Sequence, residues 1–190
     1  MTGLIVHPWP GPVPALKDGV FVIGVQTSPQ RARARAQIRE AVLQALAAVL
    51  RLPPEVISIT SPPGQPPRIM LTNDARSIGC SFAHENSYAL AAINLGGAVG
   101  VDLMRVQEVP DWQTVARDYL GPTASAALAD TAISNLPAAF AQAWTRREAA
   151  LKCSGQQLSE WRADIVGATT LLAIPAPDLV GHIQTGDKQR

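Results

Sequence analysis

The sequence predicts an α+β fold in which two long helices alternate with groups of short strands. Residues 30–50 repeat apolar side chains at the three- or four-residue spacing of a helix, and residues 138–152 have a similar helical pattern. Short apolar runs separated by glycine and proline surround these helices, a pattern typical of antiparallel strands. With 190 residues, 47% of them hydrophobic, the chain can bury a sizeable core without disulfides.

The first half of the chain is predicted to hold one helix and several strands. The helix at 30–50 begins after Ser28 and Pro29 and is closed by Pro53 and Pro54. The proline-rich stretch 61–67 predicts a loop, because proline removes backbone donors and disfavours regular structure. Apolar runs predict strands at 20–25, 56–59, 68–71, 78–82 and 88–94.

The second half begins at the glycine pair 96–97, which predicts a turn before a strand at 98–103. The pattern then becomes helical, and Gly155 is a plausible stop for the last and longest helix. The tail at 165–183 is apolar and favours strands, although Pro175 and Pro177 interrupt it. The predicted helices are 112–119, 124–131 and 138–152.

Composition argues against several classes of function. The formal net charge of +1 creates no strong field toward nucleic acid or an anionic membrane. Cys80 and Cys153 lack metal-ligand spacing and suit a reducing compartment better than a disulfide framework. Residues 1–14 have no charged region and contain four prolines, so we do not expect a signal peptide. No apolar run approaches the roughly 20 residues of a membrane span, and we expect a cytoplasmic protein.

Two short segments carry the candidate chemistry. The predicted strand at 98–103 presents the carboxylate of Asp102, and Trp144, Glu148 and Lys152 share one stripe of the long helix. Two separated carboxylates suit a hard cation such as Mg²⁺, which needs few protein ligands beside water and phosphate oxygens. A lysine one turn beyond Glu148 can reach such a phosphate. The alternatives are a turn-capping Asp102 and a Glu148–Lys152 pair on a solvated helix face.

Gly-Val-Asp at 100–102, followed by Trp-Thr-Arg-Arg-Glu-Ala-Ala-Leu-Lys at 144–152, resembles the signature of the phosphopantetheinyl transferases. Glu148 follows Asp102 by 46 residues, a separation that fits this superfamily, which includes holo-acyl-carrier-protein synthase. The resemblance implies transfer of the phosphopantetheine arm of coenzyme A to a serine of an acyl or peptidyl carrier protein. The implied reaction depends on Mg²⁺ and releases adenosine 3′,5′-bisphosphate.

The resemblance to the larger class of this superfamily also implies an architecture. We expect a monomer that is a pseudo-dimer of two similar lobes, each with a long helix packed on a small, mostly antiparallel sheet. Residues 1–96 would form the lobe that binds the nucleotide of coenzyme A. Residues 97–190 would form the lobe with the metal site and the catalytic helix.

The resemblance further implies a role for each candidate residue. Asp102 and Glu148 would bind Mg²⁺, and Lys152 would stabilise the charge that grows on the leaving phosphate. Glu148 is also the candidate base for the serine proton, directly or through a water molecule. Trp144 is expected to be a core aromatic beside Phe140 rather than a reacting group. The residues expected to contact coenzyme A are Arg35, Gln65, Pro66, His84 and Lys152.

The basic residues of the first long helix have three interpretations. Arg31, Arg35 and Arg39 share one helix stripe, which by default is a solvated face and could also bind nucleic acid. The resemblance instead implies that an arginine near the start of this helix binds the 3′-phosphate of coenzyme A. Arg35 fits that position best and Arg33 second, whereas Arg39, one turn deeper, should matter little if that part of the helix simply faces water.

Several residues depart from the pattern of the superfamily. Met104 stands where the larger class has a third carboxylate, and a thioether is a poor ligand for Mg²⁺. Ala83 replaces a serine before His84, whose alternative role is that of an exposed or structural histidine. Glu85 adds a negative charge near the expected phosphate. Glutamines replace a lysine at 65 and a glycine at 157. Compared with the superfamily the sequence also ends early, so we expect the closing strands of the second lobe to be short or missing. An alternative function is therefore that of a weak or inactive relative that binds coenzyme A or a carrier protein.

Overall fold

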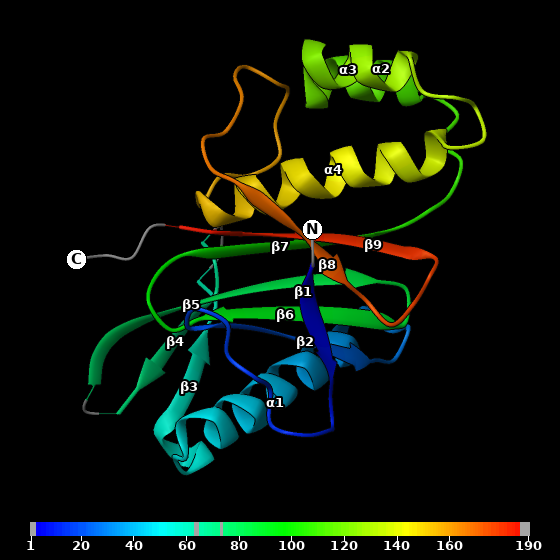
Figure 1. Cartoon of the computed structure of the whole chain (residues 1–190). Coiled ribbons are helices and arrows are strands. Elements are labelled where there is room, and N and C mark those ends of the chain that lie inside the picture. The colour runs from blue at the N-terminus through cyan, green and yellow to red at the C-terminus, as the bar shows by residue number, and fades with distance from the viewer. Residues whose placement is uncertain (1–2, 63–64, 73, 187–190) are drawn as a thin grey trace.

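The computed structural model describes residues 3–62, 65–72 and 74–186, and it confirms the α+β class. Its strands lie between the two long helices, and a group of short helices covers the far side of one of them (Figure 1). Helix α4 (Leu136–Cys153) covers one layer of strands, and helix α1 (Arg31–Leu50) covers the other.

The strands of the described residues hydrogen-bond in the order β3-β4-β5-β6-β2-β1-β8-β9-β7. This mixed sheet folds over so that its two parts face each other, since one apolar cluster joins Val22 and Leu90 to Val101 and Ile183. The strands are β1 (Leu4–Pro8), β2 (Val20–Gln26), β3 (Ile57–Thr60), β4 (Arg68–Leu71), β5 (Asp74–Glu85), β6 (Tyr88–Asn94), β7 (Val99–Arg105), β8 (Thr169–Ala173) and β9 (Leu179–Thr185).

Helix α1 has the apolar stripe that its sequence predicts. Ile38, Val42 and Leu46, four residues apart, are buried against Phe21 and Ile23 of β2. The helix ends at Arg51, which takes the left-handed conformation with φ of 56°. The predicted range 30–50 is therefore confirmed to within one residue.

The tail of the chain forms two complete strands, so the expectation of short or missing closing strands is wrong. Strand β9 pairs with β7 along its full length, from Val99↔Thr185 to Arg105↔Leu179. Pro175 and Pro177 lie between β8 and β9 and interrupt neither of them. Proline there does not cost a ladder hydrogen bond, because it occupies the connection rather than the strand.

Strand β1 is an element that the sequence pattern did not predict. It runs parallel to both β2 and β8, with Val6↔Val22 on one side and Leu4↔Leu172 on the other. Its proline-rich surroundings hide it from a local pattern, because its stability comes from partners distant in the sequence. By pairing with both neighbours, β1 joins the two parts of the sheet.

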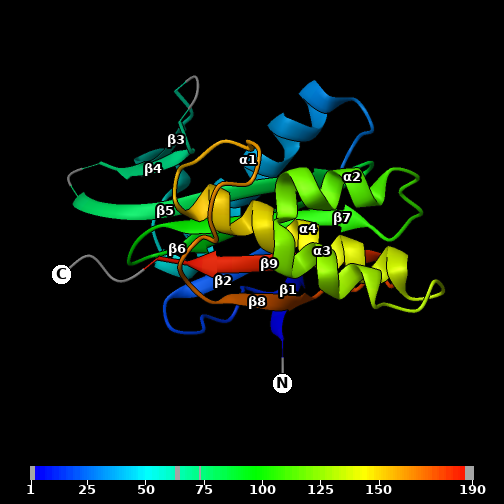
Figure 2. The same ribbon diagram turned by 90° about the horizontal axis from the view of Figure 1, so that it is seen from above.

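A group of short helices lies beside α4, as Figure 2 shows from above. The predicted helix at 112–119 is divided into α2 (Trp112–Val115) and a π-helical turn at Ala116–Leu120, and α3 (Pro122–Ala129) follows. Their apolar residues share a core with Phe140 of α4. Within the described ranges, no helix combines the length and hydrophobicity needed to cross a bilayer.

Each long helix covers its own part of the folded sheet, an arrangement compatible with the implied fold of two lobes. Glycines 96 and 97 lie between β6 and β7, where the sequence placed the change from one half to the other. A structural similarity of the two halves, and a domain boundary at 96–97, stay predictions.

Candidate functional site

Strand β7 directs alternate side chains to opposite faces, and this alternation positions Asp102. Val101 and Leu103 enter the core between the two parts of the sheet. Asp102 therefore faces the other side, toward α4, and is only 8% exposed. Gly100 lies two residues earlier on the same face.

Gly100 allows α4 to approach the strand at van der Waals distance. A Cβ added at this glycine would collide with the carbonyl oxygen of Ala149 and with the backbone of Cys153. The helix therefore rests directly on β7, so that side chains on its lower face reach the carboxylate of Asp102. Glycine is required here by space rather than by an unusual φ.

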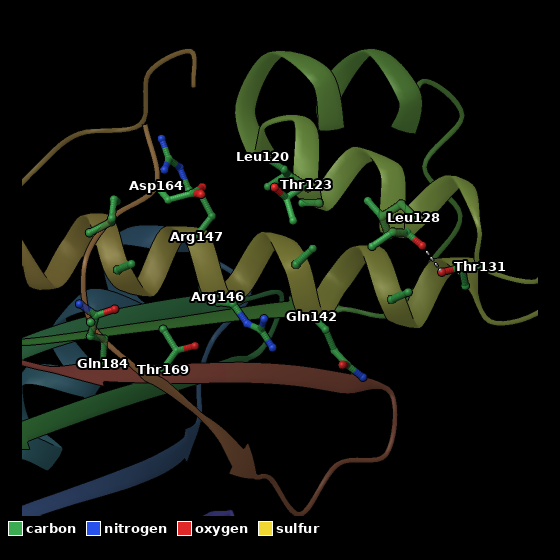
Figure 3. A pocket seen from close by; sticks show the side chains of 17 residues that line it. Leu120, Thr123, Leu128, Thr131, Gln142, Arg146, Arg147, Asp164, Thr169 and Gln184 are labelled. Atoms are coloured by element: carbon green, nitrogen blue, oxygen red, sulfur yellow. Dashed lines mark hydrogen bonds between the residues drawn. The ribbon is translucent and has the colours of Figure 1, made fainter. Parts of the chain in front are cut away.

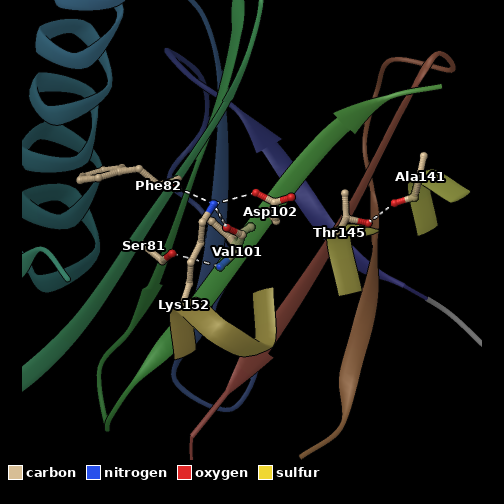
Figure 4. Close-up of polar contacts among 7 residues, drawn as sticks. All are labelled: Ser81, Phe82, Val101, Asp102, Ala141, Thr145 and Lys152. Carbon is tan, nitrogen blue, oxygen red and sulfur yellow. Dashed lines mark hydrogen bonds and ion pairs between the residues drawn. The ribbon is translucent and has the colours of Figure 1, made fainter. Parts of the chain in front are cut away.

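Lys152 binds Asp102 and also bridges two strands (Figure 4). Its Nζ donates to Asp102 Oδ1 at 2.6 Å, to the carbonyl oxygen of Val101 at 3.1 Å and to that of Phe82 at 3.4 Å. An ammonium group has three protons, so these acceptors use its full donor capacity. Phe82 belongs to β5, and the ammonium therefore links β5 of the first half to β7 of the second.

The carboxyl of Glu148 is partly buried and close enough to Asp102 to be affected by its charge. Burial raises the pKa of Glu148 above its ordinary value, and the charge of Asp102 raises it further. Burial also raises the pKa of Asp102, although the neighbouring Lys152 offsets part of that effect. Glu148 accepts no hydrogen bond from the part of the chain that the structure describes. Two close carboxylates with raised pKa values form a site that a further cation would stabilise.

A cleft of about 880 Å³ opens beside this cluster, between α1, β5 and β7. Asp102 and Lys152 line one part of the cleft and Arg35 of α1 lines another. Arg31 and Arg39 line it as well, so the arginine stripe faces the cleft rather than open solvent alone. Glu148 does not line the cleft, but its carboxyl interacts electrostatically with that of Asp102, which does.

Arg39 differs from its sequence-based expectation. Its Nη2 donates to Ser61 Oγ at 2.6 Å, and its guanidinium lies over the ring of Phe82 at 5.9 Å from the centroid. The side chain is therefore held against the wall of the cleft, and the expectation that it simply faces water is wrong. The periodicity of α1 could not reveal this, because Ser61 and Phe82 come from other parts of the chain.

His84 lies near the end of β5 with its side chain exposed, and it lines the same cleft. Ala83 before it is buried in the core between the sheets. Glu85 is close enough to raise the pKa of Asp102, although its effect is the smallest of those acting on that carboxyl. A negative charge near the cluster is therefore present, as the sequence suggested.

Gln65 and Pro66 line a smaller neighbouring cleft of about 310 Å³. The two clefts share Pro67, Phe82 and Lys152. The structure thus brings the candidate residues of the loop at 61–67 close to Lys152 without placing them in the larger cleft. Gly64, the residue before them, lies outside the described residues.

Trp144 and Met104 belong to the helical core. Trp144 stacks on Phe140 with a centroid distance of 6.1 Å and meets Tyr119 edge-on, which agrees with its predicted core role. Met104 packs against the same cluster. The position of the third carboxylate is therefore occupied by an apolar side chain that contacts α4 and its neighbours.

Another pocket, of about 450 Å³, lies on the opposite face of α4 (Figure 3). Ala124 and Leu128 of α3 and Ala143 and Arg146 of α4 line it, together with the loop that precedes β8. Among the described residues, none of the predicted site residues lines this pocket. Four of them, Arg35, His84, Asp102 and Lys152, instead line the cleft of about 880 Å³.

His182 and Thr145 are buried polar residues near the cluster that the sequence analysis did not single out. His182 of β9 lies directly opposite Asp102 in the β7–β9 pairing, and its Nδ1 is 2.8 Å from Thr145 Oγ1. Burial lowers the pKa of His182 to about 4, with a contribution from Arg146. The sequence offered one signal, a histidine within an apolar tail, but only the structure shows that Thr145 is its partner.

An α+β fold in which a lysine of α4 binds a strand aspartate, with a glutamate one turn earlier on the same helix, is the arrangement that the two sequence motifs imply. Residues 98–177 match the model of the 4′-phosphopantetheinyl transferase superfamily. Both motifs lie inside this segment, so the resemblance found in the sequence is confirmed.

A protein of Synechocystis sp. named "Putative 4′-phosphopantetheinyl transferase" is similar to this chain, with 28% identity over 132 residues. The aligned residues make up 69% of this chain and 53% of the relative. The chain therefore spans about half the length of the curated relative it matches.

Proposed function

We propose that this protein transfers the phosphopantetheine arm of coenzyme A to a serine of an acyl or peptidyl carrier protein. The observation that carries the proposal is the division of charge around one cleft. Arginines of α1 line one wall, and Asp102 with Lys152 lines another, next to Glu148. Such a division suits a ligand that carries phosphates at one end and reacts at a phosphate near the carboxylates.

The donor set of the carboxylate cluster fits Mg²⁺. Asp102 and Glu148 supply hard oxygen ligands, and their raised pKa values reflect burial, with Asp102 adding a repulsion on Glu148 that a divalent cation would relieve. Lys152 contacts Oδ1 of Asp102, and no described residue forms a hydrogen bond or ion pair with Glu148. When bound, Mg²⁺ would supply electrostatic stabilisation of the phosphate charge.

Lys152 and Glu148 have distinct roles in the proposed reaction. The serine oxygen forms a bond to the β-phosphorus of coenzyme A, and the bond from that phosphorus to the bridging oxygen of the nucleotide breaks. Lys152 places positive charge beside the oxygen that leaves with adenosine 3′,5′-bisphosphate. Glu148 takes the serine proton, directly or through a water molecule. Its raised pKa makes it a stronger base than an ordinary carboxylate.

The residues proposed to bind coenzyme A follow the length of the cleft. Arg35 would bind the 3′-phosphate, with Arg31 and Arg39 close by on the same stripe. His84 would donate a hydrogen bond to a phosphate oxygen. Gln65 and Pro66 would contact the adenine end from the adjoining cleft.

A second candidate is a relative that binds coenzyme A or a carrier protein without catalysis. The donors of Lys152 are all used by protein acceptors, and Met104 supplies no carboxylate. In an active enzyme, Lys152 would have to exchange the weak 3.4 Å bond to Phe82 for a phosphate oxygen. The two candidates therefore differ in whether Lys152 gives up a protein partner when the ligand binds.

Mass spectrometry of apo carrier proteins after incubation with coenzyme A and Mg²⁺ tests the proposal. We expect a gain of one phosphopantetheine arm on a serine, and we expect Asp102→Asn to abolish it. Arg33→Ala is a matched control, because Arg33 is exposed on α1 and does not line the cleft. Binding of coenzyme A without modification of any carrier favours the second candidate. Salt-dependent binding of oligonucleotides, with none of coenzyme A, would contradict both.

A further inference from the structure

The hydrogen bonds of Thr145 define the tautomer of His182. Thr145 is fully buried, and its Oγ1 lies 2.7 Å from the carbonyl oxygen of Ala141 and 2.8 Å from His182 Nδ1. A hydroxyl has one proton, and a carbonyl oxygen can only accept, so that proton is donated to Ala141. The hydroxyl oxygen must then accept from His182, whose Nδ1 carries the proton.

This hydrogen bond joins α4 to β9 beside the candidate site. His182 lies opposite Asp102 in the strand pairing, and Thr145 lies three residues before Glu148, on a neighbouring part of the same helix face. Among the described residues, it is the one side-chain hydrogen bond between α4 and β9. His182 is 3% exposed, so solvent does not compete for the bond.

Near the bond, α4 meets the strands through small residues. Ala149 lies against Gly100 of β7, and Ala141 is fully buried. A helix that slides by one residue moves about 1.5 Å along its axis, which is enough to separate two groups in contact. A buried, directional hydrogen bond penalises such a slide, because it would leave polar groups unpaired.

We propose that Thr145 and His182 are positioning residues that hold α4 in the register at which Glu148 lies beside Asp102. Neither residue is proposed to touch the substrate. The inference rests on the proposed function, since it assigns to this pair the alignment of the carboxylates. Its test therefore includes measurements that do not depend on transfer activity.

The first measurement is the position of α4 on β7 in crystal structures of the metal-free variants. We expect Thr145→Ser, which keeps the hydroxyl, to retain the parent position. Thr145→Val has nearly the same shape but cannot accept the hydrogen bond. In that variant we expect α4 to move along its axis by about 1.5 Å, the rise of one residue. An unchanged position of α4 in folded Thr145→Val overturns the inference.

The second measurement is Mg²⁺ affinity by calorimetry, with kcat and the KM for coenzyme A where transfer is observed. Changes in the residues that orient metal ligands typically cost 10- to 100-fold, so we expect a loss of about tenfold or more in Mg²⁺ affinity and kcat for Thr145→Val. The KM for coenzyme A should stay within about twofold, because the arginines of α1 are untouched. A lower melting temperature with parental Mg²⁺ affinity would instead show a purely structural role and overturn the inference.

The double variant Thr145→Val/His182→Phe covers the case in which Thr145→Val does not fold. It removes both polar groups, and apolar replacement of both partners avoids an unpaired buried donor. We expect it to fold, with α4 shifted and Mg²⁺ binding weakened as in Thr145→Val. The parental position of α4 together with parental Mg²⁺ affinity in this variant overturns the inference. If the parent protein modifies no carrier, the proposed function fails, whereas the position of α4 in the variants still decides the positioning role.

Discussion

The ammonium of Lys152 lies 2.6 Å from the carboxylate of Asp102 and is shared with the carbonyl oxygen of Phe82. The pair is mostly shielded from solvent, with side-chain exposures of 31% for Lys152 and 11% for Asp102. One lysine thus neutralises a buried carboxylate and connects β5 to β7 across the two halves of the chain. Replacing Lys152 should therefore change the stability of the protein as well as its activity.

Lys152→Met is expected to destabilise the protein, because it leaves the charge of Asp102 buried without a partner. Loss of one member of a buried pair costs about 3–5 kcal/mol, and the partial exposure here favours the lower end. Urea denaturation measures the loss. The double variant Lys152→Met/Asp102→Asn should recover much of it while remaining inactive. A double variant as unstable as the single one would show that the lysine stabilises mainly through its carbonyl contacts.

Glu148→Gln is expected to stabilise the metal-free protein at neutral pH and to remove its stabilisation by Mg²⁺. The pKa of Glu148 is raised in the folded state, so folding favours the protonated carboxyl. Its contribution to stability is complete below the unfolded pKa and is lost as the pH rises through the folded pKa. The neutral amide avoids this loss. Melting temperatures at pH 7 with and without Mg²⁺ test both effects, and a less stable metal-free variant would contradict the assignment.

Arg35→Ala is expected to weaken the binding of coenzyme A more than that of dephospho-coenzyme A, which lacks the 3′-phosphate. Loss of a charge-assisted hydrogen bond costs about 1.5–3 kcal/mol, which is about ten- to a hundredfold in affinity. Calorimetry with both ligands gives the comparison, and Arg33→Ala serves as the control on the same helix.

Arg39→Ala is the informative counterpart of that experiment. Because Arg39 is held by Ser61 and lies over Phe82, its loss is expected to weaken the binding of both ligands to a similar degree. A loss selective for coenzyme A at Arg39, with none at Arg35, would move the 3′-phosphate site one turn along α1.

The stability contributed by His182 is expected to depend on pH. Its pKa is lowered to about 4 from 6.5, so the folded state favours the neutral ring. The contribution is complete above pH 6.5 and is lost as the pH falls toward 4. His182→Asn does not titrate in this range. The stability difference between parent and variant, measured by urea denaturation, should therefore shrink on acidification.

The carboxyls of Asp102 and Glu148 titrate with the opposite sign, but both proteins contain them, so their effects cancel in the difference. A difference that stays constant between about pH 7 and about pH 4 would show that His182 is not held neutral by the fold.

The local sequence pattern was sufficient to predict the elements that have a strong periodicity of their own. The apolar stripe of α1 and the apolar run of β2 are strong periodic patterns, and the structure has them within one or two residues. The α4 motif and the Gly-Val-Asp strand likewise have local signatures. The candidate residues Asp102, Glu148 and Lys152 follow from these, because spacing on a helix and alternation on a strand are local properties.

Tertiary structure decided the features that depend on distant partners. Strand β1 exists because β2 and β8 pair with it, and β9 is complete because β7 offers it seven residues to pair with. The contacts of several site residues also depend on distant partners. The sequence by itself determined which side chains could do the chemistry, since that is a matter of residue type and local spacing. Only the fold decided that Lys152 meets Phe82, that Arg39 meets Ser61 and that Thr145 meets His182, because these contacts join segments whose separation along the chain carries no local signal.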